Sequence, residues 1–210
     1  MRALVVYESM FGNTQMIADA VAAGLAHRMR VDAVEVGSAP ATLDDDVTLL
    51  VVGGPTHAFG MSRPRTRQDA ATQAPAGLVS GRIGLREWLA ALRAPAGMAA
   101  AAFDTKVSKP HLPGSAARAA EKRLRRLGFR IAALAESFYV GGTLGPLLEG
   151  EQDRAMRWGG QLGATPASSR AAPDHDPDAD AGEAVVARAG LGTRRWSSLG
   201  HHLESPVGQS

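Results

Sequence analysis

Short apolar runs alternate with amphipathic stretches along the first 164 residues, and this alternation constrains the fold more than any other feature of the chain. Five runs have the length of buried strands: 3–7, 31–36, 47–52, 98–103, and 129–135 continuing through 138–140. Between most of them apolar residues recur at helical spacing, as at Ile17, Val21 and Leu25. Strands that alternate with helices pair in parallel through right-handed crossovers. The sequence therefore predicts a three-layer α/β sandwich in one domain, residues 1–164.

Three segments depart from this alternation. The connection from Val36 to Val47 is short for a crossover helix, so a loop or a single helical turn is expected there. The stretch 61–81 has two prolines and no sustained period, which predicts a long loop or an irregular lobe. From Thr165 onward the composition shifts to Pro, Ser, Asp and Ala, which predicts a disordered tail over 165–210.

Composition excludes several classes of function. The chain has no cysteine, which rules out disulfides, thiolate catalysis and Cys-ligated metal clusters. The net charge of +2, from 23 basic and 21 acidic residues, is too weak to indicate nucleic-acid binding. The acidic tail around Asp174 and His175 lacks a rigid frame, so no metal site is predicted. With neither a secretory signal nor a run of about 20 apolar residues, we expect a cytoplasmic protein with no membrane span.

The loop after the first strand has the composition of an anion site. It runs through the six residues before and at the start of the first helix: Ser9, Met10, Phe11, Gly12, Asn13 and Thr14. The first N–H groups of a helix have no intrahelical acceptor, and the helix dipole favours negative charge there. Gly12 permits close approach of the backbone, and the Ser9 and Thr14 hydroxyls add donors. The loop lacks the Gly-Lys-Ser/Thr of a P-loop and the Gly-x-Gly-x-x-Gly of dinucleotide-binding proteins. A nucleoside triphosphate or a dinucleotide is therefore a less favoured ligand.

This loop resembles the first loop of the flavodoxin family. The family pattern is met at every fixed position, by Val5, Val6, Tyr7, Ser9, Gly12, Thr14 and Ala18. Phe11 departs from it, because a second hydroxyl residue is usual there. The resemblance implies a five-stranded parallel sheet of order 2-1-3-4-5, with FMN as cofactor and its phosphate bound by Ser9–Thr14.

Two further loops are candidate flavin sites. In doubly wound sheets ligands bind beyond the carboxyl ends of the strands, where the loops after strands three and four lie. The first resembles a loop of flavodoxin-like quinone reductases that contacts the flavin ring, with candidates Pro55, Thr56, His57, Ala58, Phe59 and Gly60. His57 and Phe59 are aromatic groups that could lie against that ring. The second corresponds to the other flavin loop of flavodoxins, with candidates Phe103, Asp104 and Thr105; Lys106, Lys109 and His111 make it basic.

The resulting hypothesis is an FMN-binding redox protein that passes electrons or hydride through the flavin, with no side chain required as a catalytic acid or base. Its partner would be a redox protein, or a small molecule of the NAD(P)H or quinone type. The alternatives are an FMN-dependent quinone or protoporphyrinogen-type oxidoreductase, and an interaction module that keeps the fold without the cofactor. Arg63, Arg65 and Arg67 are expected to form a basic rim beside the flavin that attracts anionic partners. The oligomeric state is left open.

Overall fold

The computed structural model describes residues 1–74, 77–109 and 113–164, and the predicted tail 165–210 lies outside this range. The strands are β1 (Arg2–Tyr7), β2 (Arg30–Glu35), β3 (Val47–Pro55), β4 (Ala99–Val107), β5 (Arg130–Ile131) and β6 (Glu136–Val140). The helices are α1 (Asn13–Ala26), α2 (Pro64–Ala71), α3 (Leu85–Ala91), α4 (Ala116–Arg126) and α5 (Glu151–Ala164). Among the described residues, no helix has the length and apolar character needed to cross a membrane.

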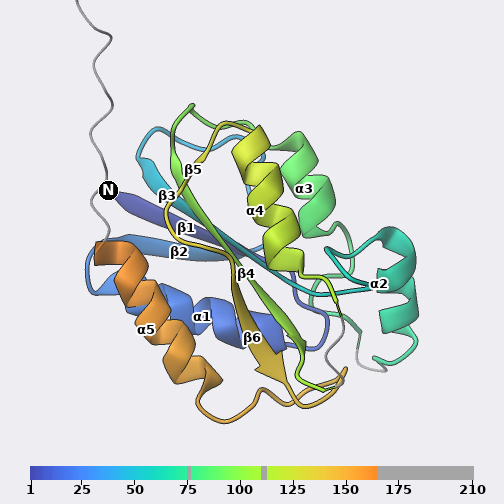
Figure 1. Cartoon of the computed structure of the whole chain (residues 1–210). Helices are drawn as coiled ribbons and strands as arrows, with labels where there is room; N and C mark the ends of the chain where they lie inside the picture. Colours follow the sequence, from blue (N-terminus) through green and yellow to red (C-terminus); the bar gives the residue numbers. More distant parts are fainter. Residues whose placement is uncertain (75–76, 110–112, 165–210) are drawn as a thin grey trace, which may run out of the picture. The chain divides into compact units, whose positions relative to one another are not determined.

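The strands form one parallel sheet of order β2-β1-β3-β4-β5, which confirms the predicted fold class (Figure 1). The fifth position is shared by β5 and β6, which both pair with β4. Between them, four residues (132–135) stand opposite two residues (101–102) of β4, so the chain bulges away from the sheet before pairing resumes. The single apolar run in the sequence therefore becomes two short strands.

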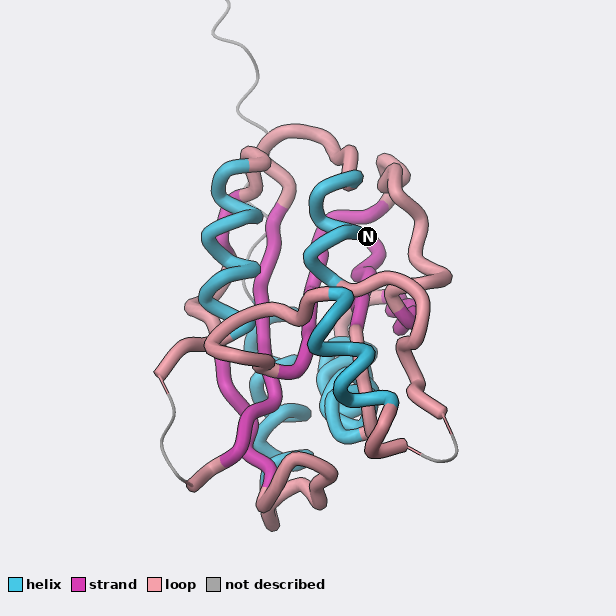
Figure 2. Tube along the Cα trace, turned by 90° about the vertical axis from the view of Figure 1, so that its right-hand side faces the viewer, coloured by secondary structure: helices cyan, strands magenta, loops and turns pink. Residues whose placement is uncertain are grey.

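Helices cover both faces of the sheet (Figures 1 and 2). On one face, Leu4 and Val6 of β1 pack with Leu89 of α3 and Leu124 of α4. On the other face, strand residues one position along, such as Val5 of β1, pack with residues of α1 and α5. Successive strand side chains point to opposite faces, so a strand buried on both sides must be apolar throughout. That requirement explains the continuous apolar runs in the sequence.

Helices α1 and α5 approach one another at backbone distance because glycines stand at their crossing. A Cβ added to Gly24 would lie 2.0 Å from the carbonyl oxygen of Met156, and one added to Gly159 would lie 2.3 Å from that of Val21. Neither space admits any side chain. The two glycines therefore fix how closely α5 lies against α1.

The stretch 61–81 contains helix α2, so the prediction of a long loop or irregular lobe is wrong for residues 64–71. Pro64 occupies the first turn, where its missing N–H costs nothing, and the Thr66 hydroxyl accepts a hydrogen bond from the Arg63 N–H at 2.9 Å. The buried residues of α2 are Arg67 and Ala70. Because a buried arginine leaves no apolar period, the pattern of hydrophobic residues could not reveal this helix. The connection 36–46 has no helix, as its length predicts.

Candidate functional site

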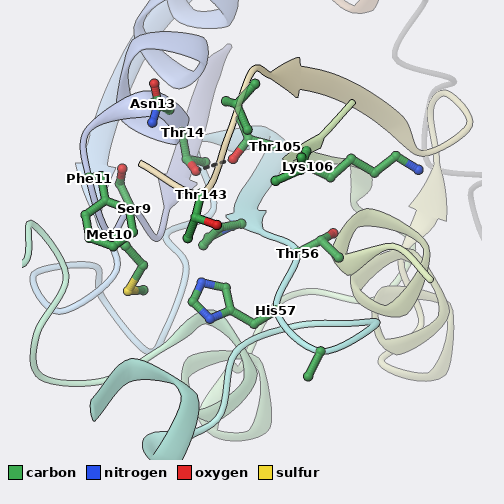
Figure 3. A pocket seen from close by; sticks show the side chains of 14 residues that line it. Ser9, Met10, Phe11, Asn13, Thr14, Thr56, His57, Thr105, Lys106 and Thr143 are labelled. Carbon is green, nitrogen blue, oxygen red and sulfur yellow. Dashed lines mark hydrogen bonds between the residues drawn. The ribbon is translucent and has the colours of Figure 1, made fainter. Parts of the chain in front are cut away.

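A pocket of about 270 Å³ opens at the carboxyl ends of the strands (Figure 3). The residues that line it come from the carboxyl ends of β3, β4 and β6, from the loops after β1, β3 and β6, and from the start of α1: Ser9, Met10, Phe11, Asn13, Thr14, Pro55, Thr56, His57, Ala58, Thr105, Lys106, Val107, Val140 and Thr143. Ten of these are among the fifteen residues that the sequence suggests. The structure therefore brings the three predicted loops together around one cavity.

The first loop turns sharply at Gly12, which has a φ of 89° and precedes α1. This left-handed conformation costs glycine little and strains other residues. The buried Ser9 hydroxyl accepts hydrogen bonds from the N–H groups of Gly12 at 3.1 Å and Gln15 at 3.4 Å, which holds the loop against the start of the helix. The Ser9 backbone is paired in turn with Ser80, whose hydroxyl accepts from the Ser9 N–H at 3.0 Å.

Four backbone N–H groups of this loop find no acceptor among the described residues: those of Met10, Phe11, Asn13 and Thr14. All four residues line the pocket. A Cβ built on Gly12 between them meets nothing within 4 Å, so there is room beside the backbone. Unpaired N–H groups at a helix N-terminus are a binding site for an anion, because they supply both donors and a positive potential.

The end of β4 and the loop after β6 are tied to this site by side chains of α1. The hydroxyls of Thr14 and Thr105 lie 2.7 Å apart (Figure 3). The Asn13 amide donates to the carbonyl of Leu144 at 3.2 Å. A Cβ on Gly145 would lie 2.6 Å from the Asn13 side chain, so the loop after β6 lies close against the first loop.

The loop after β3 contains a two-residue turn with an unusual backbone. His57 and Gly60 exchange N–H···O hydrogen bonds of 2.8 and 3.0 Å, and the residues between them, Ala58 and Phe59, have φ values of 41° and 75°. Positive φ at both positions suits Asn-Gly and strains other residues. The turn rests on Gly114, where a Cβ would lie 2.1 Å from the Phe59 carbonyl oxygen. The Phe59 side chain is 61% exposed and does not line the pocket.

His57 places its imidazole in the pocket, facing the first loop across the cavity (Figure 3). Burial lowers the pKa of this imidazole, and repulsion from the nearby Arg67 guanidinium lowers the pKa further. At neutral pH His57 is therefore an uncharged group with one N–H donor and one nitrogen acceptor.

Asp104 has a structural role. Its Oδ2 atom accepts hydrogen bonds from the hydroxyls of Thr56 at 2.9 Å and Ser115 at 2.6 Å, and from the N–H of Ala117 at 3.0 Å. The carboxylate thus caps α4 and fixes Thr56 at the pocket wall. Its Oδ1 atom is buried and has no partner among the described residues.

Phe103, the neighbour of Asp104, is fully buried and packs edge-to-face against Phe138 and Trp158. Its ring fills the space over Gly53, where a Cβ would lie 2.0 Å from it. The side chain of Phe103 therefore lies in the core and does not reach the pocket. Gly60 lies in the β3 turn, likewise outside the lining.

A buried polar network lies behind the first loop, and the sequence gives little sign of it. Glu8 accepts hydrogen bonds from the Ser62 hydroxyl and, at 2.8 Å, from the Leu85 N–H at the start of α3. Arg67 donates to Ser62 at 2.8 Å and lies 3.1 Å from a carboxylate oxygen of Glu87. Arg67 is only 6% exposed, so the prediction that it belongs to a basic surface rim is wrong. Arg63 and Arg65 are exposed.

Four lining residues were not predicted as site residues: Lys106, Val107, Val140 and Thr143. Val140 and Thr143 come from the strand end and loop that follow β6. The rule that places ligands beyond the carboxyl ends of strands applies to this loop as well, and its Gly141-Gly142-Thr143 sequence marks a turn there. His111 lies outside the described residues.

No carboxylate is found among the described residues that line the pocket, and Lys106 gives the lining its formal charge. Within residues 1–74, 77–109 and 113–164, no three potential metal-ligating side chains come together. The pocket thus combines unpaired N–H donors at one end with His57, Met10, Phe11 and two valines on its walls. It can hold an anionic group at the helix and a flat, partly apolar group beside it.

Comparison with known proteins agrees with this geometry. The flavodoxin family model matches residues 5–77, which include the end of β1, the first loop and the turn after β3. Comparison with curated proteins gives no significant sequence match.

Three flavodoxin structures have the same fold. The Streptococcus pneumonia TIGR4 flavodoxin is 20% identical with a TM-score of 0.56, over 78% of this chain and 99% of that one. Oxidised Flavodoxin 1 from Bacillus cereus is 16% identical with a TM-score of 0.56, over 77% and 97%. A flavodoxin from the domain Archaea is 19% identical with a TM-score of 0.53, over 78% and 96%. The chain is thus similar to flavodoxins in sequence over residues 5–77, and it shares the fold of flavodoxin structures.

Proposed function

We propose that this protein binds FMN in the pocket at the strand ends and serves as an electron-transfer flavoprotein. The observation that carries the proposal is the set of four unpartnered N–H groups in the Ser9–Thr14 loop. A phosphate dianion would satisfy several of them at once, and the positive end of the α1 dipole favours its charge. A phosphate-bearing ligand fits this end of the pocket better than a neutral one.

The residues that line the rest of the pocket favour a flat heteroaromatic ring as the ligand. His57, Ala58 and Pro55 form one wall, and Val107 and Val140 contribute apolar surface. Thr56 and Thr105 bring polar groups to the same region, held by Asp104 and Thr14 respectively. An apolar slot with a few fixed polar groups is the usual architecture of a cofactor site. FMN, when bound, supplies reversible one- and two-electron chemistry; the chain binds and orients it and sets the charge around it.

The residues proposed to hold FMN are those suggested by the sequence except Phe59 and Gly60, which lie outside the pocket lining, with two further qualifications. Phe103 and Asp104 act through packing and capping, because the side chain of one lies in the core and that of the other holds α4. Lys106, Val107, Val140 and Thr143 are added as residues of the pocket wall.

Comparing FMN with riboflavin tests the proposal, because riboflavin has the same ring and lacks the phosphate. Purified full-length chain is freed of flavin and titrated with each ligand, following the quenching of flavin fluorescence. FMN is expected to bind more tightly than riboflavin by at least about tenfold, the value of one charge-assisted hydrogen bond or more. Equal affinities would mean that the first loop binds no phosphate, and no binding of either flavin would overturn the proposal.

A second measurement separates electron carriage from small-molecule catalysis. The FMN-loaded chain is mixed with NADH or NADPH and a benzoquinone, and nicotinamide oxidation is followed by absorbance. An electron carrier is expected to turn over slowly with these reagents while exchanging electrons with a protein partner. Rapid saturable turnover would instead favour the oxidoreductase alternative.

A further inference from the structure

Exposed basic residues lie on the segments that adjoin the pocket lining in sequence. Two described stretches reach this edge of the sheet, residues 56–66 after β3 and residues 105–109 and 113–118 after β4. They contain five basic residues and no acidic one: Arg63, Arg65, Lys106, Lys109 and Arg118. We call these five residues the basic rim. In the part of the chain that the structure describes, none of them lies within 4.0 Å of a carboxylate oxygen.

Among the described residues, the charged groups of the basic rim form no ion pairs that would stabilise the fold. Arg63, Arg65, Lys109 and Arg118 are exposed. Lys106 is half-buried, its ammonium lies 5.7 Å from the centre of the Tyr139 ring, and its side chain extends away from the pocket centre (Figure 3). By contrast Arg67, on the same helix as Arg65, is buried and paired with Glu87. Unpaired cations around one opening raise the local concentration of anions there.

An exposed aromatic side chain stands in the middle of this charge. Phe59 is held on the strained turn between the start of α2, where Arg63 and Arg65 lie, and Gly114, just before the α4 helix that carries Arg118. Two positive-φ residues in succession cost stability, and Asn-Gly would form the same turn without strain. A strained turn that exposes an apolar ring to solvent does not add to the stability of the fold. It is of use to a surface that another protein covers, where aromatic anchors dominate binding.

We infer that the basic rim and Phe59 form a docking surface for an acidic redox protein that exchanges electrons with the pocket's cofactor. The inference rests on the proposed function, since it requires FMN in the pocket. The cations steer the partner to the pocket mouth, and Phe59 is the contact that the partner buries. A partner with a one-electron redox centre would exchange one electron with the bound flavin at each encounter, so two encounters would complete a two-electron change.

Two small oxidants of opposite charge test the steering. The FMN-loaded full-length chain is reduced and mixed in a stopped-flow instrument with ferricyanide, an anion, or with tris(phenanthroline)cobalt(III), a cation. Two ferricyanide ions take one electron each from the reduced flavin and become ferrocyanide, and the flavin's protons are released to water. Raising the ionic strength from about 10 mM to about 300 mM should slow the reaction with ferricyanide and quicken that with the cobalt complex. The opposite pair of salt effects, or none, would overturn the inference.

Matched variants locate the charge. Replacing Arg63, Arg65 and Arg118 with Ser should slow ferricyanide about fivefold at low salt and reduce the salt effect. The control replaces Arg28, Arg126 and Arg157, three exposed arginines away from the pocket mouth, and changes the net charge equally. It should keep most of the parent's rate. If both triple variants behave alike, net charge and not the rim sets the rate.

Protein probes test the docking itself. A plant-type [2Fe–2S] ferredoxin, which is acidic, should bind the FMN-loaded chain more tightly at low salt than cytochrome c, which is basic. Phe59→Gly should weaken ferredoxin binding about fivefold and leave the ferricyanide rate unchanged. Equal ferredoxin binding by parent and Phe59→Gly would remove Phe59 from the surface. Tighter binding of cytochrome c would reverse the charge of the partner. Failure of the chain to bind FMN, measured first, would count against the proposed function alone.

Discussion

Beneath the first loop, the carboxylate of Glu8 lies 4.0 Å from the guanidinium of Arg67, and the Ser62 hydroxyl bridges them by hydrogen bonds to both. Glu8 is 1% and Arg67 6% exposed. Burial raises the pKa of Glu8, although its hydrogen bonds and Arg67 oppose that rise. The pair therefore connects the first loop, which begins at the next residue, to helix α2.

Replacing Arg67 with Met should destabilise the fold by about 3–5 kcal/mol, because it leaves Glu8 as a buried charge without its cation. The free energy of unfolding from urea titration measures the loss. Arg65→Met, two residues earlier on the exposed side of α2, should cost about 0.5 kcal/mol or less. Similar losses in the two variants would contradict the assigned role of Arg67.

The same variant should depend on pH in a defined direction. A carboxyl group whose pKa is raised by folding binds protons more tightly in the folded state, so its contribution to stability falls as pH rises through the folded pKa. Removing Arg67 raises that pKa further. The stability difference between parent and Arg67→Met should therefore be largest at neutral pH and shrink as pH falls toward about 4.3, the ordinary value for glutamate. A difference that is constant with pH would exclude Glu8 as the cause.

Arg67→Met should also raise the pKa of His57. The guanidinium of Arg67 is one cause of the lowered pKa, with burial the larger cause, so the value should move up without reaching that of an exposed histidine. Titration of the imidazole nitrogens by NMR measures it, with Arg65→Met as the reference variant. An unchanged His57 titration would show that burial alone sets its pKa.

Gly12→Ala should lower FMN affinity more than it lowers stability. The new Cβ occupies the open space between the four unpaired N–H groups, where a phosphate would approach. Gly128→Ala is the matched control, because Gly128 has a φ of 86°, its Cβ would also meet nothing, and it lies away from the pocket. Both variants should lose about 1 kcal/mol of stability from backbone strain. A tenfold or larger loss of FMN affinity is expected for Gly12→Ala alone, by fluorescence titration.

The Thr14–Thr105 hydroxyl pair predicts coupled effects on FMN binding. Thr14→Val should weaken FMN by about 1–2 kcal/mol, the value of a hydrogen bond to a charged group. Thr105→Val should weaken it too, since it removes the hydroxyl that orients Thr14. In a double-mutant cycle the combined variant should lose less than the sum of the two. Strict additivity would mean that the two hydroxyls act independently.

Ala58→Asn combined with Phe59→Gly should stabilise the protein by about 1–2 kcal/mol, because both residues suit the positive φ that the turn requires. For a domain of this size that corresponds to a rise in Tm of roughly 2–8 °C. Phe59→Leu keeps a strained side chain at the same φ and should give no gain. A Tm that does not rise in the Asn-Gly variant would show that the turn is not strained.

The sheet could be predicted from the sequence, because strands buried on both faces must be apolar along their whole length. In β1, β3 and β4 this requirement produces continuous apolar runs. The sequence was also sufficient for the first loop, whose glycine and hydroxyls follow from the needs of a sharp turn before a helix. Helix α2 could not be predicted in this way, because Arg67 occupies its buried face. The apolar residues of this segment therefore do not recur at helical spacing. The hydrogen bonds of Glu8 join residues 54 and 77 positions apart in sequence, and no local pattern records such pairings.

The candidate site was likewise predictable in part: its loops could be identified from the sequence, and the direction of individual side chains could not. Position in the chain identifies loops, so the three loops around the pocket were predictable. Which side chains face the cavity depends on strand register and on turn geometry: the register of β4 places Phe103 in the core, and the turn after β3 places Phe59 on the outer surface. Thr143 follows β6, where the sequence carries a turn signal and no ligand-binding motif.

The glycine crossing of α1 and α5 has a consequence for ligand capture. With Gly24 and Gly159 leaving backbone against backbone, α1 can neither slide along its axis nor rotate without collision. Its N-terminal amides thus point into the cavity before any ligand arrives. Binding an anion would therefore cost no conformational entropy for ordering these amides. Nearly all of the attraction between the amides and the anion would appear as affinity.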